Sequence, residues 1–223
     1  MSVKLFFEAI IKYIIGVILV GLLLFVPAGT FKYINGILFM CLLFIPMFIA
    51  GIIMMIKSPN LLKERLDVKE KESKQKKVVG ISAVMFILGF VLAGLNYRYS
   101  WIKLPNIVVL ISSVIFVLSY ILYAVVLKQN AFLARTIKVD KGQELITTGL
   151  YSVVRHPMYT ATIFLFLSMP LILNSIISFI MFLIYPFIII ARLNNEEEVL
   201  EKELKGYKKY KEKVRYKLIP FIW

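Results

Sequence analysis

Long apolar runs divide the chain, and short blocks of charged residues separate them; this pattern limits the possible folds more than any other feature. Of the 223 residues, 60% are hydrophobic, and the charges gather between the apolar runs instead of interrupting them every few positions. A helix needs about 20 apolar residues to cross the hydrocarbon core of a bilayer. Several runs approach or exceed that length, so the sequence predicts an all-α, polytopic integral membrane protein and not a soluble domain.

We expect six apolar helical segments, of which the last two form a helix hairpin. The segments are residues 10–26, 34–56, 78–95, 107–127, 159–173 and 176–191. Pro46 predicts a kink in the second segment. The last two segments would make roughly 24 Å of helix each, so the hairpin either crosses a thinned bilayer or dips into it without crossing. The expected division is a four-helix membrane region over residues 1–127 and a unit of cofactor-binding loop, hairpin and cytosolic tail over residues 128–223, with a helix in the tail; together they would form one structural unit.

A charged block lies between the second and third segments. Residues 57–77 carry eight basic and four acidic residues, and Leu61, Leu62 and Leu66 lie among them. Two interpretations fit this composition: a short amphipathic helix lying on the membrane surface, or a solvated charged loop.

The distribution of basic residues predicts the orientation of the chain. With six segments, 24 of the 27 Lys and Arg residues fall on the side that holds both termini, and three fall on the other side. Basic residues favour the cytoplasmic side of a membrane, so we expect both termini to be cytosolic, at the inner membrane if the source is bacterial. The net charge of +14 lies beside apolar spans, which indicates contact with bilayer lipid and not with nucleic acid. The single cysteine, Cys41, lies in an apolar run, so neither a disulfide nor a thiolate metal site is expected.

Polar residues that could perform chemistry gather on the predicted cytosolic side. The only histidine, His156, follows Arg155 and precedes Pro157, a residue that suits the first position of a helix. Because the hairpin returns to the side from which it started, this motif should lie near Arg192 and the run of glutamates that begins at Glu196. Each residue alone fits a simpler interpretation, as an interfacial anchor or a solvated helix face. The combination is more specific than its parts.

The motif Arg155-His156-Pro157-x-Tyr159 resembles the signature of the isoprenylcysteine carboxyl methyltransferase family, which is related to the phospholipid methyltransferases. The upstream Gly149-x-Tyr151, Arg192 with Glu196 and Glu197, and the aromatic tail extend the resemblance from about residue 130 to the C-terminal end. This resemblance implies a membrane methyltransferase that uses S-adenosylmethionine (SAM), enclosed between the last helices and the cytosolic tail. No glycine-rich nucleotide loop follows a strand, so a Rossmann-type SAM site is not expected.

The resemblance also assigns residue roles. The cofactor would be bound by residues of the loop, the motif and the last helix, namely Gln143, Glu144, Leu145, Ile146, Tyr151, His156, Pro157, Met158, Tyr159 and Glu196. Arg192 would face the methyl acceptor, as a catalytic and substrate-binding residue, and no metal is implied. The chain departs from the family pattern at Ala161, where glycine is usual, and at Gln143, where histidine is common.

The acceptor is expected to be lipophilic, a small molecule or a prenylated group, that enters laterally from the bilayer. A carboxylate acceptor is already ionised at neutral pH and needs no base, and Arg192 could hold it with two hydrogen bonds. An amine acceptor, as in a phospholipid N-methyltransferase, would need a base, for which Glu197 is the nearest candidate. A sterol- or lipid-reductase-like enzyme that binds NADPH is a further alternative. A transporter or purely structural membrane protein is less well supported, because inverted repeats and charged mid-bilayer helices are not evident.

Overall fold

The computed structural model describes residues 3–67, 73–130, 132–133, 136, 139 and 142–223, and every regular element in this part of the chain is a helix. The elements are α1 (Val3–Ala28), α2 (Ile34–Lys57), α3 (Pro59–Leu66), α4 (Ser73–Tyr99), α5 (Asn106–Gln129), the 3-10 helix η1 (Gly149–Ser152), α6 (Pro157–Ile172), α7 (Ile176–Phe182), α8 (Tyr185–Glu203) and α9 (Tyr207–Lys213).

The polytopic prediction is confirmed. Five helical stretches of the described chain are long and apolar enough to cross a membrane: Val3–Ala28, Ile34–Lys57, Gln75–Tyr99, Asn106–Gln129 and Ile176–Glu203. The sixth apolar segment is α6, which is shorter than the other five. Pro46 lies inside α2, which continues through it from Ile34 to Lys57.

The helices extend beyond the apolar runs that predicted them. The helix of the first segment starts at Val3 and not near residue 10, and that of the third starts at Ser73 and not at Val78. Hydropathy detects only the part of a helix that suits hydrocarbon, whereas a membrane helix continues into the headgroup region, which makes the whole bilayer thicker than its core. The charged block contains a true helix, α3, with Leu61 and Leu62 buried. The remaining residues of that block from 68 to 72 lie outside the described chain.

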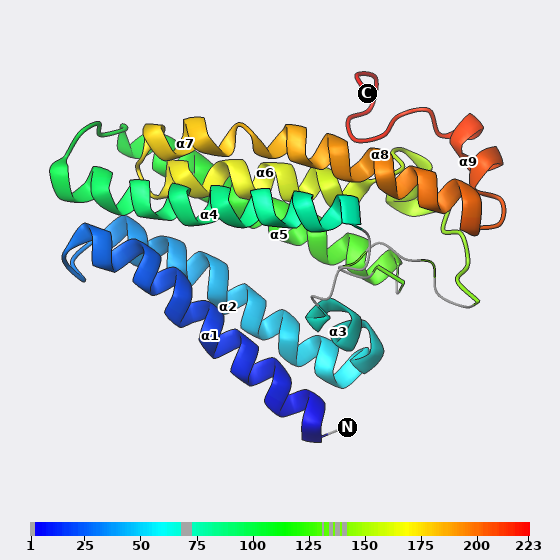
Figure 1. Ribbon diagram of the computed structural model, residues 1–223, viewed down its shortest axis with the longest axis horizontal. Coiled ribbons are helices and arrows are strands. Elements are labelled where there is room, and N and C mark those ends of the chain that lie inside the picture. Colours follow the sequence, from blue (N-terminus) through cyan, green and yellow to red (C-terminus); the bar gives the residue numbers. More distant parts are fainter. Residues whose placement is uncertain (1–2, 68–72, 131, 134–135, 137–138, 140–141) are drawn as a thin grey trace.

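The spanning helices lie roughly side by side, and their connections collect at two ends (Figure 1). The N-terminal end of α1, the short helix α3, helix α9 and the C-terminal end of the chain lie toward one end. The turn between α1 and α2, the loop between α4 and α5, and the turn between α6 and α7 lie at the other. In Figure 1 the hairpin of α1 and α2 diverges from the bundle of α4 to α8 toward the first end.

The predicted hairpin is present, with a sharp turn after α6. Asn174 adopts a left-handed backbone conformation (φ 56°), and the Ser175 hydroxyl accepts a hydrogen bond from the backbone N–H of Ser178 at 3.2 Å, which caps α7. The returning arm, α7 followed by α8, runs back along α6 to the first end of the molecule (Figure 1). The hairpin therefore brings its two arms to one side of the bundle, as the sequence predicts.

Contacts between aromatic rings, and a close approach of two helices at one glycine, stabilise the bundle. Phe39, Phe116 and Phe182 are fully buried. The ring of Phe39 contacts that of Phe116 at 6.2 Å, and Phe90 connects Phe39 to Phe182 at 5.6 and 6.1 Å. Gly94 of α4 lies so close to α1 that a Cβ atom there would be 2.5 Å from the backbone oxygen of Leu24. A small residue lets two helix backbones approach closely, which is how membrane helices gain packing energy.

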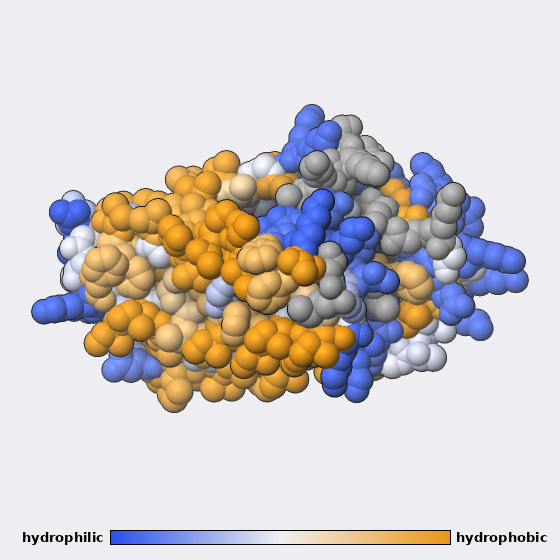
Figure 2. Space-filling view, turned by 90° about the horizontal axis from the view of Figure 1, so that it is seen from below, coloured by the Kyte–Doolittle hydropathy of each residue, from blue (hydrophilic) through white to orange (hydrophobic). Residues whose placement is uncertain are grey.

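The surface has the polarity of a membrane protein. Figure 2 shows broad apolar areas with hydrophilic residues at both ends of the molecule. Large apolar side chains such as Ile18, Ile52 and Leu118 are about half exposed along the middle of α1, α2 and α5. Apolar surface of this extent needs a lipid environment.

Candidate functional site

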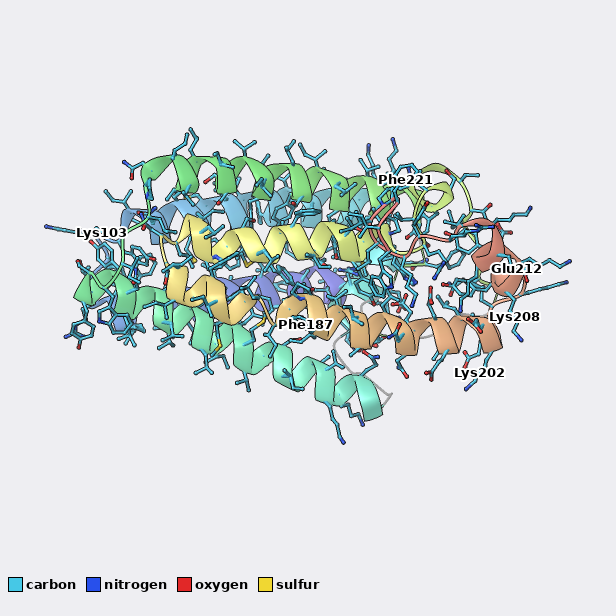
Figure 3. All side chains as sticks on the ribbon, turned by 90° about the horizontal axis from the view of Figure 1, so that it is seen from above. Lys103, Phe187, Lys202, Lys208, Glu212 and Phe221 are labelled. Atoms are coloured by element: carbon cyan, nitrogen blue, oxygen red, sulfur yellow. The ribbon has the colours of Figure 1, made fainter. Side chains whose placement is uncertain are left out.

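The beginning of α6, the far part of α8, the loop of residues 143–146 and helix α9 meet at one end of the bundle. Figure 3 shows this end, where Lys202, Lys208 and Glu212 are labelled. Two residues determine where α6 and α9 begin. Pro157 is the first residue of α6, which fixes where the helix begins. Gly206, in the left-handed conformation (φ 89°), ends the connection from α8 and lets α9 turn back toward the loop.

A buried ionic cluster, which we call the Glu197 clamp, consists of Arg155, His156, Glu197 and Tyr207. The Glu197 carboxylate accepts a hydrogen bond from Arg155 Nε at 2.6 Å and one from the Tyr207 hydroxyl at 3.3 Å. His156 Nε2 lies 3.1 Å from the same carboxylate oxygen. Both side chains of the Arg155–Glu197 pair are about 5% exposed, so the pair is shielded from water and its loss would leave a buried charge.

The same clamp fastens the C-terminal tail. The Arg155 guanidinium donates to the backbone oxygens of Val214 and Arg215 at 2.7 and 2.8 Å. The backbone N–H groups of Arg155 and His156 donate to the oxygens of Tyr216 and Lys217, each at 2.9 Å. The clamp therefore joins the start of α6, helix α8 and the tail into one unit.

Beside the clamp lies a small pocket with a cavity volume of about 90 Å³, which opens to solvent. Its wall combines apolar, aromatic and charged side chains: Asn130, Phe132, Leu133, Thr136, Gln143, Glu144, Leu145, Ile146, Tyr151, Arg155, Met158, Tyr159, Arg192, Glu196, Leu200, Leu204, Tyr207 and Tyr210.

A chain of polar contacts crosses one wall of the pocket. The Tyr159 hydroxyl donates a hydrogen bond to Glu196 and accepts one from Arg192 Nε at 3.0 Å. Arg192 also donates from Nη1 to the side-chain oxygen of Gln75 at 3.1 Å, and the Gln75 amide nitrogen lies 3.5 Å from the backbone oxygen of Arg192. Gln75 is fully buried. A carboxylate and a guanidinium are thus held a fixed distance apart by residues of α4, α6 and α8.

Tyrosines form the aromatic side of the pocket and stay neutral. Burial raises the pKa of Tyr210 to about 12, and the nearby charges of Arg155 and Glu197 act in opposite directions on it. Burial likewise raises the pKa of Tyr151, and burial followed by the Glu197 charge raises the pKa of Tyr207. The Tyr210 hydroxyl donates to the backbone oxygen of Tyr151 at 2.6 Å, and Asn130 donates to the Tyr151 hydroxyl at 3.1 Å. These bonds fix the orientation of the rings.

Most of the residues that the sequence singled out lie around this pocket. Nine of the twelve candidates line it, namely Gln143, Glu144, Leu145, Ile146, Tyr151, Met158, Tyr159, Arg192 and Glu196. The other three, His156, Pro157 and Glu197, are buried next to it and are not among the lining residues. His156 and Glu197 belong to the clamp, and Pro157 starts α6.

Gln75 is a residue of this site that the sequence did not indicate; the lining residues Asn130, Phe132, Leu133 and Thr136 were not singled out either. The sequence placed Gln75 in the lysine-rich block before the third segment, whereas it lies in the first turn of α4, against Arg192. A glutamine between lysines carries no motif, and 117 residues separate it from Arg192. Hydropathy places the start of this helix at Val78, after Gln75. Gln75 could have been assigned to the helix only if the true start at Ser73 had been known.

Two comparisons with known proteins bear on this part of the chain. The sequence model of the phospholipid methyltransferase family matches residues 106–206, from the start of α5 to the turn before α9. The Delta(14)-sterol reductase TM7SF2 of Mus musculus is 26% identical over 91 residues, which are 40% of this chain and 22% of the reductase. The chain thus spans about a fifth of the length of that relative. The family match includes both arms of the hairpin, the motif at His156 and Glu196. Residues 106–206 are therefore similar to the phospholipid methyltransferase family, the group of membrane methyltransferases that the motif resembles.

Proposed function

We propose that this protein is a SAM-dependent methyltransferase that acts at the cytosolic surface of the membrane on a lipophilic acceptor, most readily a carboxylate. The observation that supports the proposal is the pocket at the end of the hairpin, where Glu196 and Arg192 lie on one wall and are joined by Tyr159. The match of residues 106–206 to the phospholipid methyltransferase family supports the methyltransferase class. The cofactor and the acceptor are our inferences from the chemistry of the pocket.

The residues present suit SAM. The cofactor carries an ammonium group, a sulfonium and a carboxylate, so its pocket has to offer groups of both charges. Glu144 and Glu196 can accept hydrogen bonds from the ammonium or the ribose. The lining also includes two cations, Arg192 and Arg155, of which Arg155 is already paired with Glu197. Leu145 and Leu200 give apolar wall on which the adenine can lie.

When bound, SAM supplies a methyl group that is activated by the positive sulfonium. The protein contributes position and exclusion of water, since methyl transfer is an in-line displacement that gains most from alignment. The Tyr159 hydroxyl bonds both to Glu196, which would contact the cofactor, and to Arg192, which would contact the acceptor. These bonds would hold the cofactor-binding and acceptor-binding side chains in a fixed relative position. Tyr207 and Tyr210 of α9 line the pocket, and the Glu197 clamp fastens the tail that follows α9.

Arg192 suits a carboxylate acceptor. Its side chain lies on the pocket wall near the apolar part of α8, and Gln75 fixes its direction. A guanidinium can hold a carboxylate with two parallel hydrogen bonds, and a carboxylate is ionised at neutral pH, so no base is required. The acceptor's apolar part would remain in the bilayer.

An amine acceptor is the nearest alternative, and it would require a base. Glu197, the candidate from the sequence, lies in the clamp, where its charge is already balanced by Arg155 and by Lys217 at 3.5 Å. We therefore assign Glu197 a positioning role. Glu196, which lines the pocket, is the better-placed base for an amine.

The chemistry of the product distinguishes these two acceptors. Purified protein in lipid nanodiscs is incubated with methyl-labelled SAM and a lipid extract, and the labelled product is treated with mild base. We expect a label that base releases as methanol, because a methyl ester hydrolyses and a methylamine does not. A base-stable label would overturn the carboxylate assignment, and the absence of any transferred label with every extract offered would overturn the methyltransferase proposal.

A reductase-like function is the second candidate, and the similarity to the sterol reductase is what favours it. The pocket is lined by two arginines, Arg155 and Arg192, which could also contact the phosphates of NADPH. We place it second because two glutamates, Glu144 and Glu196, share the same wall and would repel those phosphates.

A further inference from the structure

A second hollow lies at the end of the bundle opposite the candidate site. It has a volume of about 630 Å³ and is formed where α1 meets α2, where α4 meets α5, and where α6 meets α7. Its lining residues are Ala28, Gly29, Thr30, Tyr33, Asn35, Asn96, Tyr97, Arg98, Ser100, Lys103, Leu173 and Asn174. The loops that join spanning helices lie at the depth of the lipid headgroups, so the hollow faces the leaflet opposite the candidate site.

The floor of the hollow is built from hydrogen bonds that connect the three loops. Asn96, only 4% exposed, donates to the backbone oxygens of Ile102 and Asn174 at 3.0 and 3.1 Å. Asn174 in turn accepts from the N–H of Leu104 at 2.6 Å and donates to its oxygen at 3.2 Å. These side chains fix the loops to one another, so the hollow is a formed feature of the fold and not a gap between loose segments.

Aromatic residues stiffen the wall. The rings of Tyr33 and Tyr97 stack with their centroids 4.3 Å apart, and the Tyr97 hydroxyl donates to the backbone oxygen of Lys32 at 3.2 Å. The Tyr33 hydroxyl donates to the backbone oxygen of Leu173. Tyr99 and Trp101, stacked at 5.8 Å, stand next to the hollow as aromatic residues do at a membrane interface.

Two cations are on the lining, Arg98 and Lys103. The Arg98 guanidinium lies against the backbone of Gly29, where a Cβ atom would be 3.5 Å from it, and its centre is 5.7 Å from the centroid of the Tyr99 ring. Lys103 points away from the bundle at this end, as Figure 3 shows. Within the described residues, no carboxylate pairs with either cation.

The charge of this end is entirely positive. Residues 27–34, 96–107 and 173–178, all within the described part, contain Lys32, Arg98 and Lys103 and no Asp or Glu. The acidic residues of the described part of the chain are all in segments that belong to the other end. A polar hollow with two cations and no opposing carboxylate attracts an anion, and the abundant anions at headgroup depth are the phosphodiesters of acidic lipids.

We propose that this hollow binds the phosphate-bearing headgroup of an anionic phospholipid from the leaflet opposite the candidate site. Arg98 and Lys103 would contact the phosphodiester, and the hydroxyls of Thr30 and Ser100 on the same lining could donate to its oxygens. The lipid would act as a fixed support for the three loops. This site is separate from the pocket beside Tyr159, so it does not depend on the methyltransferase proposal.

Native mass spectrometry of the purified protein can test the site, with phosphatidylglycerol and phosphatidylcholine added separately in detergent. We expect one phosphatidylglycerol to be retained in preference to phosphatidylcholine, and R98Q/K103Q to weaken this retention by about tenfold or more, as for two basic side chains at a membrane surface. The matched control is K32Q, which removes a cation from the same end outside the lining. The charge-preserving R98K/K103R should retain the lipid, and thermal unfolding shows whether each variant is folded.

Three results would overturn the proposal. One is equal retention of the two lipids by the wild-type protein, and another is an equal loss in K32Q and R98Q/K103Q, which would indicate only a diffuse surface charge. The third concerns the source of the phosphate: displacement of phosphatidylglycerol by millimolar inorganic phosphate would assign the site to a soluble anion. Retention in the presence of that phosphate supports the lipid.

Discussion

At the scale of single residues, two neighbouring glutamates have different surroundings. Glu196 lines the pocket and bonds to Tyr159, whereas Glu197 lies in the clamp with Arg155. Successive side chains on a helix differ in direction by about 100°, so adjacent residues contact different neighbours. The sequence predicted that the run of glutamates would come close to the motif at His156; Glu197 lies 3.1 Å from His156 Nε2, and Glu196 bonds to Tyr159 of the same motif. It could not show which of them faces the pocket, because that depends on the rotation of α8 against α6.

The clamp predicts the effect of removing one buried charge. In Glu197→Gln, the Arg155 guanidinium would lose its carboxylate partner while 4% exposed. Breaking a buried ion pair from one side costs about 3–5 kcal/mol. We expect a lower unfolding temperature and faster proteolysis of the tail after residue 204. The control is Glu203→Gln, an exposed position on the same helix. Equal protection of the tail in both variants would contradict the clamp.

Gln75 predicts a positioning effect on the acceptor side. In Gln75→Leu, Arg192 would lose the side-chain partner at its Nη1. We expect kcat to fall about tenfold, with the affinity for SAM unchanged because Gln75 does not line the pocket. Gln75→Glu, which keeps an acceptor oxygen, should recover part of the loss, and Lys76→Gln at the exposed neighbouring position should have no effect. An unchanged kcat in Gln75→Leu would rule out this role.

At the scale of helices, the sequence predicted the number and order of the elements well and their ends less well. The apolar runs found each span, and the charged block yielded α3. The predicted tail began at Arg192, yet α8 continues to Glu203. Hydropathy reports where a helix leaves hydrocarbon, whereas Glu, Leu and Lys are good helix formers in water as well. The bonds between the tail and α6 could not be predicted, because they join backbone groups, which carry no sequence signal.

The contact between α1 and α4 predicts different effects for two glycines of one helix. Gly94→Ala would put a methyl group 2.5 Å from the oxygen of Leu24, whereas a Cβ atom at Gly80 meets nothing within 4 Å. Overpacking of this kind costs about 1–3 kcal/mol. We expect Gly94→Ala to lower the thermal unfolding temperature in detergent and Gly80→Ala to leave it unchanged or raise it, since Ala favours a helix over Gly. Equal stability of the two variants would contradict the close approach of α1 and α4.

At the scale of the whole molecule, the distribution of basic residues along the sequence agrees with the two ends of the helical bundle. Of the 24 basic residues that the sequence assigned to one side, those in the described part of the chain belong to the end that holds both termini and the candidate pocket. Figure 3 shows Lys202 and Lys208 at that end and Lys103 at the other. The sequence predicted this separation because topology follows from the order of apolar and basic segments. The shape of the pocket could not be predicted, because it depends on where a loop, a hairpin and a tail meet.

Labelling with a membrane-impermeant maleimide tests the orientation. The chain has one cysteine, Cys41 in α2, so a Cys41→Ser background can accept a single new cysteine at Lys103 or Lys208. In intact cells we expect reaction at position 103 only, and at position 208 only after permeabilisation. The reverse pattern would place both termini outside the cytosol, and reaction at both positions in intact cells would contradict the spanning arrangement.

The most direct test of the account is calorimetric titration of the purified protein with SAM and, separately, with NADPH. We expect SAM to bind and NADPH not to bind. Glu196→Gln should weaken SAM by about tenfold or more, because it removes the charge from a hydrogen bond to a cation, while Glu203→Gln should leave the affinity unchanged. Binding of NADPH without binding of SAM, or full SAM affinity in Glu196→Gln, would contradict the assignment of the pocket.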